Sequence, residues 1–217
     1  MKKIKAALFD LDGTLVDSEW QYTNFWQSKG EEYNTGIPDF AHFIKGTTLD
    51  HILATHFPDK ETQKKLIRQL DEFEQSMDFT PIAGAVEFIK DLKAHGVKCA
   101  IVTSSNQPKM AQVAKSQGDF LGLFDAILTS EDFAASKPDP SCYLAGAVKM
   151  SAAIDECVVF EDAFNGIQAG LNAGMFVVGL TTVNSREKIA PLCGHVIDDY
   201  RGLDYDSLCN IVKVENP

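Results

Sequence analysis

The sequence FDLDGTLVDS, residues 9–18, begins at the end of an apolar run and carries two aspartates separated by a single residue. The run before it, residues 4–10, is short and continuously apolar, which is typical of a strand buried on both faces of a sheet. Asp10 and Asp12 therefore lie at the end of a predicted buried strand. An Asp-Gly pair is also a common turn sequence, so this stretch taken alone favours a simple capped turn over a catalytic pair.

Five further short apolar runs predict strands of the same kind, at residues 97–103, 124–129, 157–161, 176–180 and 195–197. Helical patterns alternate with these runs. Two of them, residues 85–94 and 163–173, are followed by Gly96 and Gly174, which suit the C-terminus of a helix. This alternation predicts the α/β class, with a Rossmann-like parallel sheet wrapped by helices.

Residues 17–80 break the alternation, because they contain no convincing strand. Amphipathic helical patterns cover residues 19–28, 49–55 and 61–77 instead. A crossover between parallel strands needs only about a dozen residues, so this segment is far too long to be one. We predict an inserted α-helical cap domain at residues 17–80, with a catalytic core formed by residues 1–16 and 81–217. Four aromatic residues are predicted to form the cap's own core: Trp20, Tyr22, Phe25 and Trp26.

Polar residues stand at or shortly after the carboxyl ends of four predicted strands, where ligands bind in open parallel sheets. They are Asp10 and Asp12, Thr103 and Ser104, Lys137, and Glu161 and Asp162. Carboxylate oxygens suit Mg²⁺, which prefers hard oxygen ligands and the oxygens of a phosphate. A hydroxyl and a mobile lysine cation suit phosphate oxygens. Together these groups can neutralise a phosphoryl group during its transfer.

Four ordered segments then resemble the motifs of the haloacid dehalogenase superfamily: residues 9–18, Thr103, Lys137 with Pro138, and Glu161-Asp162 followed by residues 165–170. Residues 17–80 resemble the small cap of its β-phosphoglucomutase-like branch. An aspartate pair alone is a weak signal, whereas four motifs in order are specific. The dehalogenase branch lacks an aspartate at position 12, so Asp12 favours phosphate chemistry.

The resemblance implies a role for each of these residues. Asp10 attacks phosphorus and becomes an aspartyl phosphate. Asp12 protonates the leaving oxygen, then takes a proton from the hydrolytic water. Asp10, the Asp12 backbone carbonyl and Asp162 hold Mg²⁺, with Glu161 as a direct or a water-bridged ligand. Two further positions hold the phosphoryl oxygens, namely Thr103 with its neighbour Ser104, and Lys137.

The expected function is Mg²⁺-dependent hydrolysis of a small phosphorylated metabolite, with a sugar phosphate as the favoured class. A β-phosphoglucomutase-type mutase is the first alternative. It would need a cap arginine for a second phosphate, yet residues 45–49 read KGTTL and Tyr22 stands where a histidine would fall. Lys45 could contact the substrate, although a solvated lysine is the simpler interpretation. A non-catalytic phosphometabolite sensor is the second alternative.

Composition limits the remaining classes. The 217 residues carry a formal net charge of −11, which disfavours nucleic acids and anionic membranes as partners. The five cysteines show no CxxC spacing, so free thiols are expected rather than a disulfide framework or a zinc site. The N-terminal apolar run is too short for a signal peptide or a membrane span. We expect a cytoplasmic protein, with a monomer as the default state.

Overall fold

The structure, a computed structural model, describes residues 3–215 and places all of their strands in one parallel sheet. The six strands are β1 Ala6–Phe9, β2 Lys98–Val102, β3 Ala126–Leu128, β4 Cys157–Glu161, β5 Phe176–Leu180 and β6 His195–Ile197. Their order across the sheet is β3-β2-β1-β4-β5-β6. The winding direction reverses between β1 and β4, and such a reversal opens a ligand-binding crevice at the carboxyl ends of the strands. The predicted α/β class and parallel sheet are confirmed.

Ten α-helices join and cover these strands in the described part of the chain. They are α1 Glu19–Glu32, α2 Phe40–Phe43, α3 Leu49–His56, α4 Lys60–Glu74, α5 Ala85–Ala94, α6 Gln107–Leu121, α7 Ser141–Met150, α8 Phe164–Asn172, α9 Arg186–Ile189 and α10 Tyr205–Glu215. Two short 3₁₀ helices lie at Ser130–Asp132 and Ile154–Glu156. The last three strands match their predicted bounds, whereas the first three are one or two residues shorter at each end. Some residues that were predicted within a strand but lie just outside it still make single backbone hydrogen bonds. An example is the bond from Thr103 N–H to the Leu128 carbonyl at 3.0 Å.

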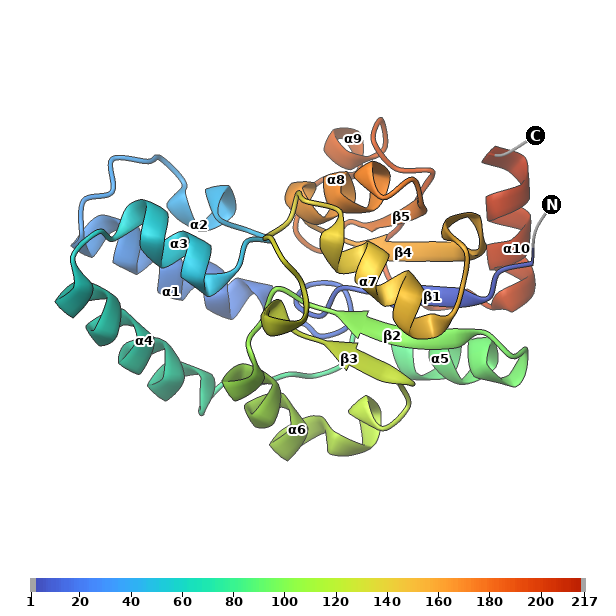
Figure 1. The fold of residues 1–217 in the computed structure, drawn as a ribbon, viewed down its shortest axis with the longest axis horizontal. Helices are drawn as coiled ribbons and strands as arrows, with labels where there is room; N and C mark the ends of the chain where they lie inside the picture. The colour runs from blue at the N-terminus through green and yellow to red at the C-terminus, as the bar shows by residue number, and fades with distance from the viewer. Residues whose placement is uncertain (1–2, 216–217) are drawn as a thin grey trace.

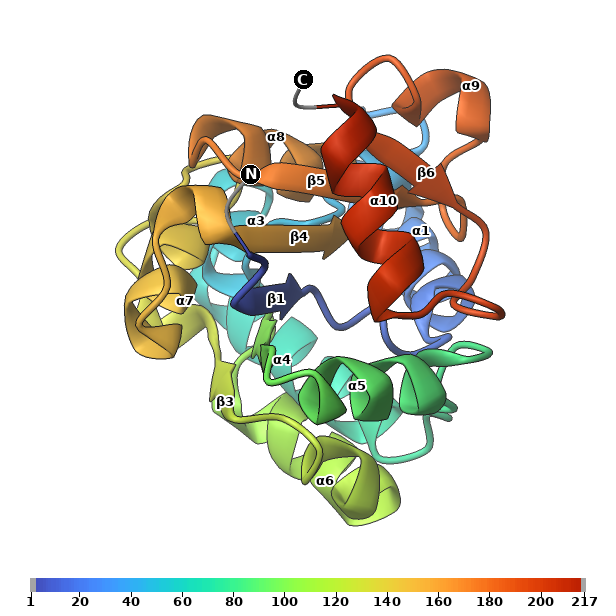
Figure 2. The ribbon, with the colours of Figure 1, turned by 90° about the vertical axis from the view of Figure 1, so that its right-hand side faces the viewer.

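Alternate residues of β1, β2, β4 and β5 feed two hydrophobic cores, one on each face of the sheet. Helices α5, α6 and α10 cover the face to which Phe9 points, and α7 and α8 cover the face to which Leu8 points (Figure 2). The Phe9 and Phe160 rings stack at 4.6 Å across β1 and β4. The two strands that carry the central carboxylates are therefore fixed by packing on both sides.

Helices α1 to α4 lie together beyond the carboxyl ends of the strands (Figure 1). They share a hydrophobic cluster of their own, which includes Trp26, Phe40, Leu66 and Leu70. The expectation that Trp20 belongs to this cluster is wrong, because its side chain is 61% exposed. Trp20 lies two residues from Tyr22, and two residues turn an α-helix by about 200°, so the two side chains point to opposite sides.

The chain enters and leaves this helical segment through two backbone segments that lie side by side. Asp17 N–H donates to the Thr80 carbonyl, and Ile82 N–H donates to the Leu15 carbonyl, both at 2.9 Å. The entry and the exit are thus tied to each other beyond the carboxyl end of β1, a central strand of the sheet.

The five cysteines are free thiols, and Cys99, Cys142 and Cys157 are buried. Burial raises the pKa of Cys99 to about 12 and that of Cys142 and Cys157 to about 11. None of the helices described over residues 3–215 is both long and apolar enough to cross a membrane.

Candidate active site

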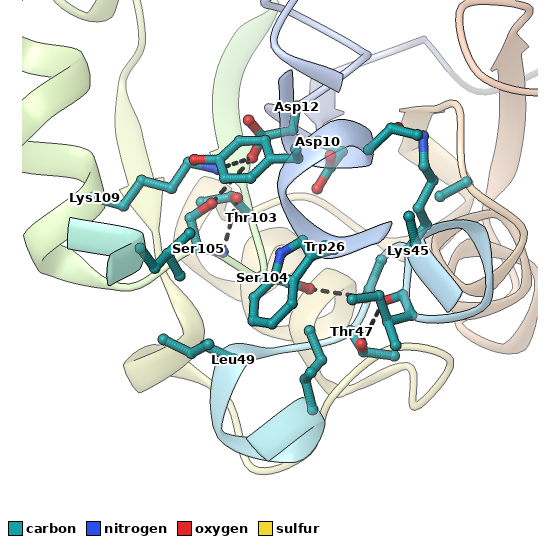
Figure 3. Close-up of a pocket in the computed structure, with 18 of the residues that line it drawn as sticks. Asp10, Asp12, Trp26, Lys45, Thr47, Leu49, Thr103, Ser104, Ser105 and Lys109 are labelled. Atoms are coloured by element: carbon teal, nitrogen blue, oxygen red, sulfur yellow. Dashed lines mark hydrogen bonds and ion pairs between the residues drawn. The ribbon is translucent and has the colours of Figure 1, made fainter. Parts of the chain in front are cut away.

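A pocket of about 810 Å³, including its open mouth, lies between the carboxyl ends of the strands and helices α1 to α4. Side chains from both parts of the molecule line it (Figure 3). From the sheet side come Asp10, Asp12, Thr103, Ser104, Ser105, Lys109 and Asp162; from the helical side come Tyr22, Trp26, Lys45, Thr47 and Glu74, among others.

Asp10 follows β1 directly and is held by Lys137. The Lys137 ammonium donates to Asp10 Oδ1 at 2.7 Å, to Glu161 Oε1 at 2.7 Å and to the Val102 carbonyl at 3.2 Å. All three ammonium hydrogens therefore have acceptors, and the Lys137 side chain is fully buried. The expectation of a mobile cation is wrong for Lys137, because it is fixed beneath the pocket instead of lining it.

Burial and the neighbouring charge have opposite effects on the pKa values of Asp10 and Lys137. Burial raises the pKa of Asp10 to about 7, Glu161 and Asp12 add to the rise, and Lys137 counteracts it. Burial also works against the charged form of Lys137, yet Asp10 and Glu161 hold the pKa of that ammonium well above its usual range. Lys137 therefore stays charged, whereas Asp10 needs further positive charge to be fully ionised at neutral pH.

Glu161 and Asp162 leave β4 at the neighbouring strand end. Glu161 Oε1 accepts from Tyr143 at 2.9 Å as well as from Lys137, and Oε2 accepts from the backbone N–H groups of Asp162 and Ala163 at 3.0 and 3.1 Å. A side chain at Gly166 would place its Cβ 1.7 Å from Glu161 Oε1. The glycine therefore makes room for this buried carboxylate.

Asp162 is oriented by its own partners. Thr14 donates to Asp162 Oδ1 at 2.9 Å, and the Asn184 amide donates to the Asp162 carbonyl at 3.0 Å. Oxygens of Asp10, Glu161 and Asp162 lie within 4.8 Å of one another. Three hard carboxylate donors in such a cluster, with no sulfur or nitrogen ligand among them, fit the oxygen preference of Mg²⁺.

Asp12 projects from the turn after Asp10 and is held by three side chains. Ser18 donates to Oδ1 at 2.5 Å, Ser105 donates to Oδ2 at 3.1 Å, and the Lys109 ammonium pairs with Oδ2. Sequence reasoning missed Lys109. It occupies the first turn of α6, where the helix dipole favours acidic residues, and a lysine in that position was the signal that could have found it.

Thr103 and Ser104 both line the pocket but differ in their contacts. Thr103 is buried, and its Oγ1 accepts from Ser105 N–H at 3.0 Å. Thr103 does not cap the next helix, because Asn106 is the N-cap and accepts from Lys109 N–H. Ser104 Oγ donates to the Gly46 carbonyl of the helical segment at 3.0 Å.

The loop that contains Lys45 rests directly on the sheet side of the pocket. In addition to the Ser104 contact, the Asn165 amide donates to the Lys45 carbonyl and Thr48 N–H donates to Ser136 Oγ, both at 2.8 Å. Gly46 adopts φ +76°, and a Cβ there would lie 3.2 Å from Asn165 Cβ. A glycine thus permits the close approach that brings Lys45 to the pocket.

Comparison with known proteins gives a consistent result. The family model for haloacid dehalogenase-like hydrolases matches residues 7–180. Hexitol phosphatase A of Escherichia coli (strain K12) is 32% identical over 184 residues, which cover 82% of this chain and 83% of that protein. β-Phosphoglucomutase of Bacillus subtilis (strain 168) is 29% identical, over 82% of this chain and 83% of that protein. A hydrolase from Pseudomonas syringae has a similar structure, with a TM-score of 0.77, 24% identity, and coverage of 97% and 99% of the two chains.

Proposed function

The chain belongs to the haloacid dehalogenase-like hydrolase family, and from this premise we propose that it is a Mg²⁺-dependent phosphatase acting on a small phosphorylated sugar or polyol. One observation carries the proposal: Asp10, Asp12 and Asp162 come from two adjacent strand ends and line one pocket together. The predicted acceptor, acid/base and metal-binding residues are thus within reach of one substrate.

In this proposal Asp10 is the nucleophile. One of its oxygens forms a bond to phosphorus while the bond from phosphorus to the leaving oxygen breaks, which produces an aspartyl phosphate. Lys137 holds Oδ1 at 2.7 Å and so fixes the direction of the attacking carboxylate. Thr103 and Ser104 line the pocket and would hold the phosphoryl oxygens, while the buried Lys137 would offset part of their negative charge without contacting them.

Asp12 supplies the proton transfers. Its carboxyl gives a proton to the leaving oxygen and, as carboxylate, then removes one from the water that attacks the aspartyl phosphate. That second attack releases phosphate and restores Asp10. The net reaction is hydrolysis of a phosphate monoester.

Asp10, Asp162 and the Asp12 carbonyl would hold Mg²⁺, with Glu161 nearby. When bound, the cation neutralises charge on the transferring phosphoryl group. It would also favour the ionised form of Asp10, whose pKa burial raises to about 7.

The helical segment, residues 17–80, is proposed as the cap that selects the substrate. It contributes Trp26, Thr47 and Lys45 to the pocket. A polyol phosphate is consistent with the relationship to the E. coli hexitol phosphatase.

A phosphosugar mutase is the second candidate, because the B. subtilis mutase is also a relative. A mutase must grip two phosphates, a task suited to a bidentate guanidinium. No arginine lines the pocket among residues 3–215. Two lysines line it: Lys109 is already paired with Asp12, so Lys45 would have to hold the second phosphate in place of an arginine. Hydrolysis is therefore favoured.

Phosphate release from a panel of hexitol, hexose and glycerol phosphates, with Mg²⁺ and with EDTA, tests the proposal. We expect Mg²⁺-dependent release from at least one of them. Incubation with β-glucose 1-phosphate separates the second candidate: a mutase would accumulate glucose 6-phosphate, whereas a phosphatase would release phosphate or leave that ester intact. A folded protein that releases no phosphate from any ester would refute the phosphatase assignment.

A further inference from the structure

Lys109 is a cation of the pocket to which none of the four sequence motifs assigns a role. It lies at the third position of α6, and its side chain is only 9% exposed. Its ammonium reaches Asp12 Oδ2 on the side of the pocket where Ser105 also lies (Figure 3). A lysine that is largely withdrawn from solvent is unusual and requires a compensating partner.

The helical segment holds the same ammonium from its other side. The Tyr22 ring, on α1, lies with its centroid 4.1 Å from Lys109 Nζ, a distance at which a cation and an aromatic face attract each other. The Tyr22 hydroxyl donates in turn to Glu74 Oε1 at 2.8 Å, at the end of α4. Lys109 therefore lies between the acid/base carboxylate and two helices of the proposed cap.

The other partners of Asp12 are two hydroxyls, one on each carboxylate oxygen. Ser18 donates to Oδ1 at 2.5 Å and Ser105 to Oδ2 at 3.1 Å. A serine hydroxyl rotates freely and can either donate or accept. The ammonium can only donate, and its position is fixed by the packing around it. Of the three groups, Lys109 is therefore the one that constrains the direction of the Asp12 carboxylate most strongly.

We propose that Lys109 is a positioning residue that holds Asp12 in the pocket for its proton transfers. The inference rests on the proposed function, in which Asp12 protonates the leaving oxygen. Without the ammonium, only the two hydroxyls hold the carboxylate, so its direction is less constrained. The proton would then be delivered less well, although Asp10, Asp162 and Lys137 would stay in place.

Leaving-group dependence reports this role directly. Phenyl phosphate loses a basic phenolate, so its transfer to Asp10 needs the proton from Asp12. 2,4-Dinitrophenyl phosphate loses a weakly basic phenolate that leaves without a proton. The two esters share a ring and a phosphate, so a defect in binding or in folding affects both, whereas a misplaced acid affects the phenyl ester selectively.

The experiment measures kcat/KM on both esters for the wild type, Lys109→Met and Lys109→Arg, with Mg²⁺ present. For Lys109→Met we expect a loss of about tenfold or more on phenyl phosphate and less than about threefold on the dinitrophenyl ester, since general acid catalysis contributes roughly 10²- to 10⁴-fold. Lys109→Arg keeps the charge and should show a smaller selective loss. If Lys109→Met does not fold, the ratio of the two kcat/KM losses is taken from Lys109→Arg instead.

Lys115→Met is the matched control, because Lys115 is an exposed lysine on the same helix. Its two kcat/KM values should equal those of the wild type. Equal losses on the two esters in both Lys109 variants would overturn the inference and make Lys109 a binding or structural residue. No loss on either ester would overturn it too. If the wild type hydrolyses neither ester nor any ester of the panel, the proposed function fails first, and the inference fails with it.

Discussion

At the residue scale, the contacts of Glu161 bear on its part in metal binding. Its two oxygens accept from Lys137, Tyr143 and two backbone N–H groups. Every one of these bonds would compete with a bond to a cation. Among the two alternatives that the sequence leaves open, we therefore favour a water-bridged Glu161, with Asp10 and Asp162 as direct ligands.

Asp10→Asn tests the nucleophile. Asparagine keeps an oxygen that can accept from Lys137, so the fold should survive with a melting temperature close to that of the wild type. It cannot form the acyl phosphate, so we expect kcat to fall roughly a thousandfold or more. Phosphate release together with thermal unfolding checks both halves. Substantial turnover in the folded variant would remove Asp10 from this role.

Metal affinity should depend on pH through Asp10. Because its pKa is raised to about 7, the carboxyl carries a proton below that pH, and Mg²⁺ must displace it. The half-saturating Mg²⁺ concentration should therefore fall about tenfold between pH 6 and pH 8. Calorimetric titration at several pH values measures this without substrate. Asp10→Asn should bind Mg²⁺ more weakly and lose this dependence, and an unchanged pH dependence in the variant would contradict the assignment.

Glu74 links stability to pH. Burial raises the pKa of this carboxyl, while Lys109 and the Tyr22 hydroxyl counteract the rise. Between the ordinary pKa of a glutamate and the raised pKa of Glu74, the folded chain retains a proton that the unfolded chain has already released. The contribution of Glu74 to stability therefore falls as the pH rises through this range. Glu74→Gln keeps an acceptor for Tyr22 and removes the titration.

Thermal unfolding from pH 4 to pH 8 should show Glu74→Gln gaining on the wild type as pH increases. Glu72→Gln, at an exposed position of the same helix, is the control and should follow the wild type. Parallel curves for the wild type and Glu74→Gln would show that Glu74 does not titrate abnormally.

At the scale of elements, the loop before α3 is hydrogen-bonded to the start of α8 and to the segment after β2. Asn165, in the first turn of α8, donates to the Lys45 carbonyl, and Ser104, after β2, donates to the neighbouring Gly46 carbonyl. These contacts close the pocket from the helical side. They involve backbone carbonyls, so the identity of the loop residues matters less than the shape of the loop.

Asn165→Ala should therefore loosen the closed arrangement. One hydrogen bond contributes about 1 kcal/mol, so we expect KM to rise roughly three- to tenfold, with a smaller change in kcat. Steady-state kinetics on the best substrate of the panel measures this. Gln168→Ala removes an exposed contact to Asn172 on the same helix and should leave KM unchanged. An unaltered KM in Asn165→Ala would show that the contact between Asn165 and the Lys45 loop does not govern substrate binding.

At the scale of the whole molecule, the sheet and the polar residues at its carboxyl edge could be predicted because both depend on local patterns. Continuous apolar runs separated by helical periodicity specify buried parallel strands, and the carboxyl ends of such strands meet at one edge. The strand pattern therefore predicts Asp10, Thr103 and Asp162 at that edge, and all three line the pocket there.

The features that could not be predicted depend on partners far apart in sequence. Lys109 meets Asp12 across 97 positions and Tyr22 across the boundary between two groups of helices. Lys137 was expected to be mobile because most lysines are exposed, and only its three acceptors explain its burial. The orientation of α1 likewise decided which of Trp20 and Trp26 enters the pocket. Composition carries no information about such contacts.

The rate at which the buried thiols are alkylated reports how often the folded protein opens. With pKa values of about 11 to 12, Cys99, Cys142 and Cys157 form almost no thiolate while the protein is folded. Burial raises the pKa of Cys193 to about 11 as well, so an alkylating reagent at pH 8 should modify at most the half-buried Cys209 quickly, and mass spectrometry would time the other four. Because Cys142 precedes Tyr143, a partner of Glu161, its labelling should slow when Mg²⁺ binds. Rapid labelling of Cys142 in the native protein would show that this end of the molecule opens far more often than its packing implies.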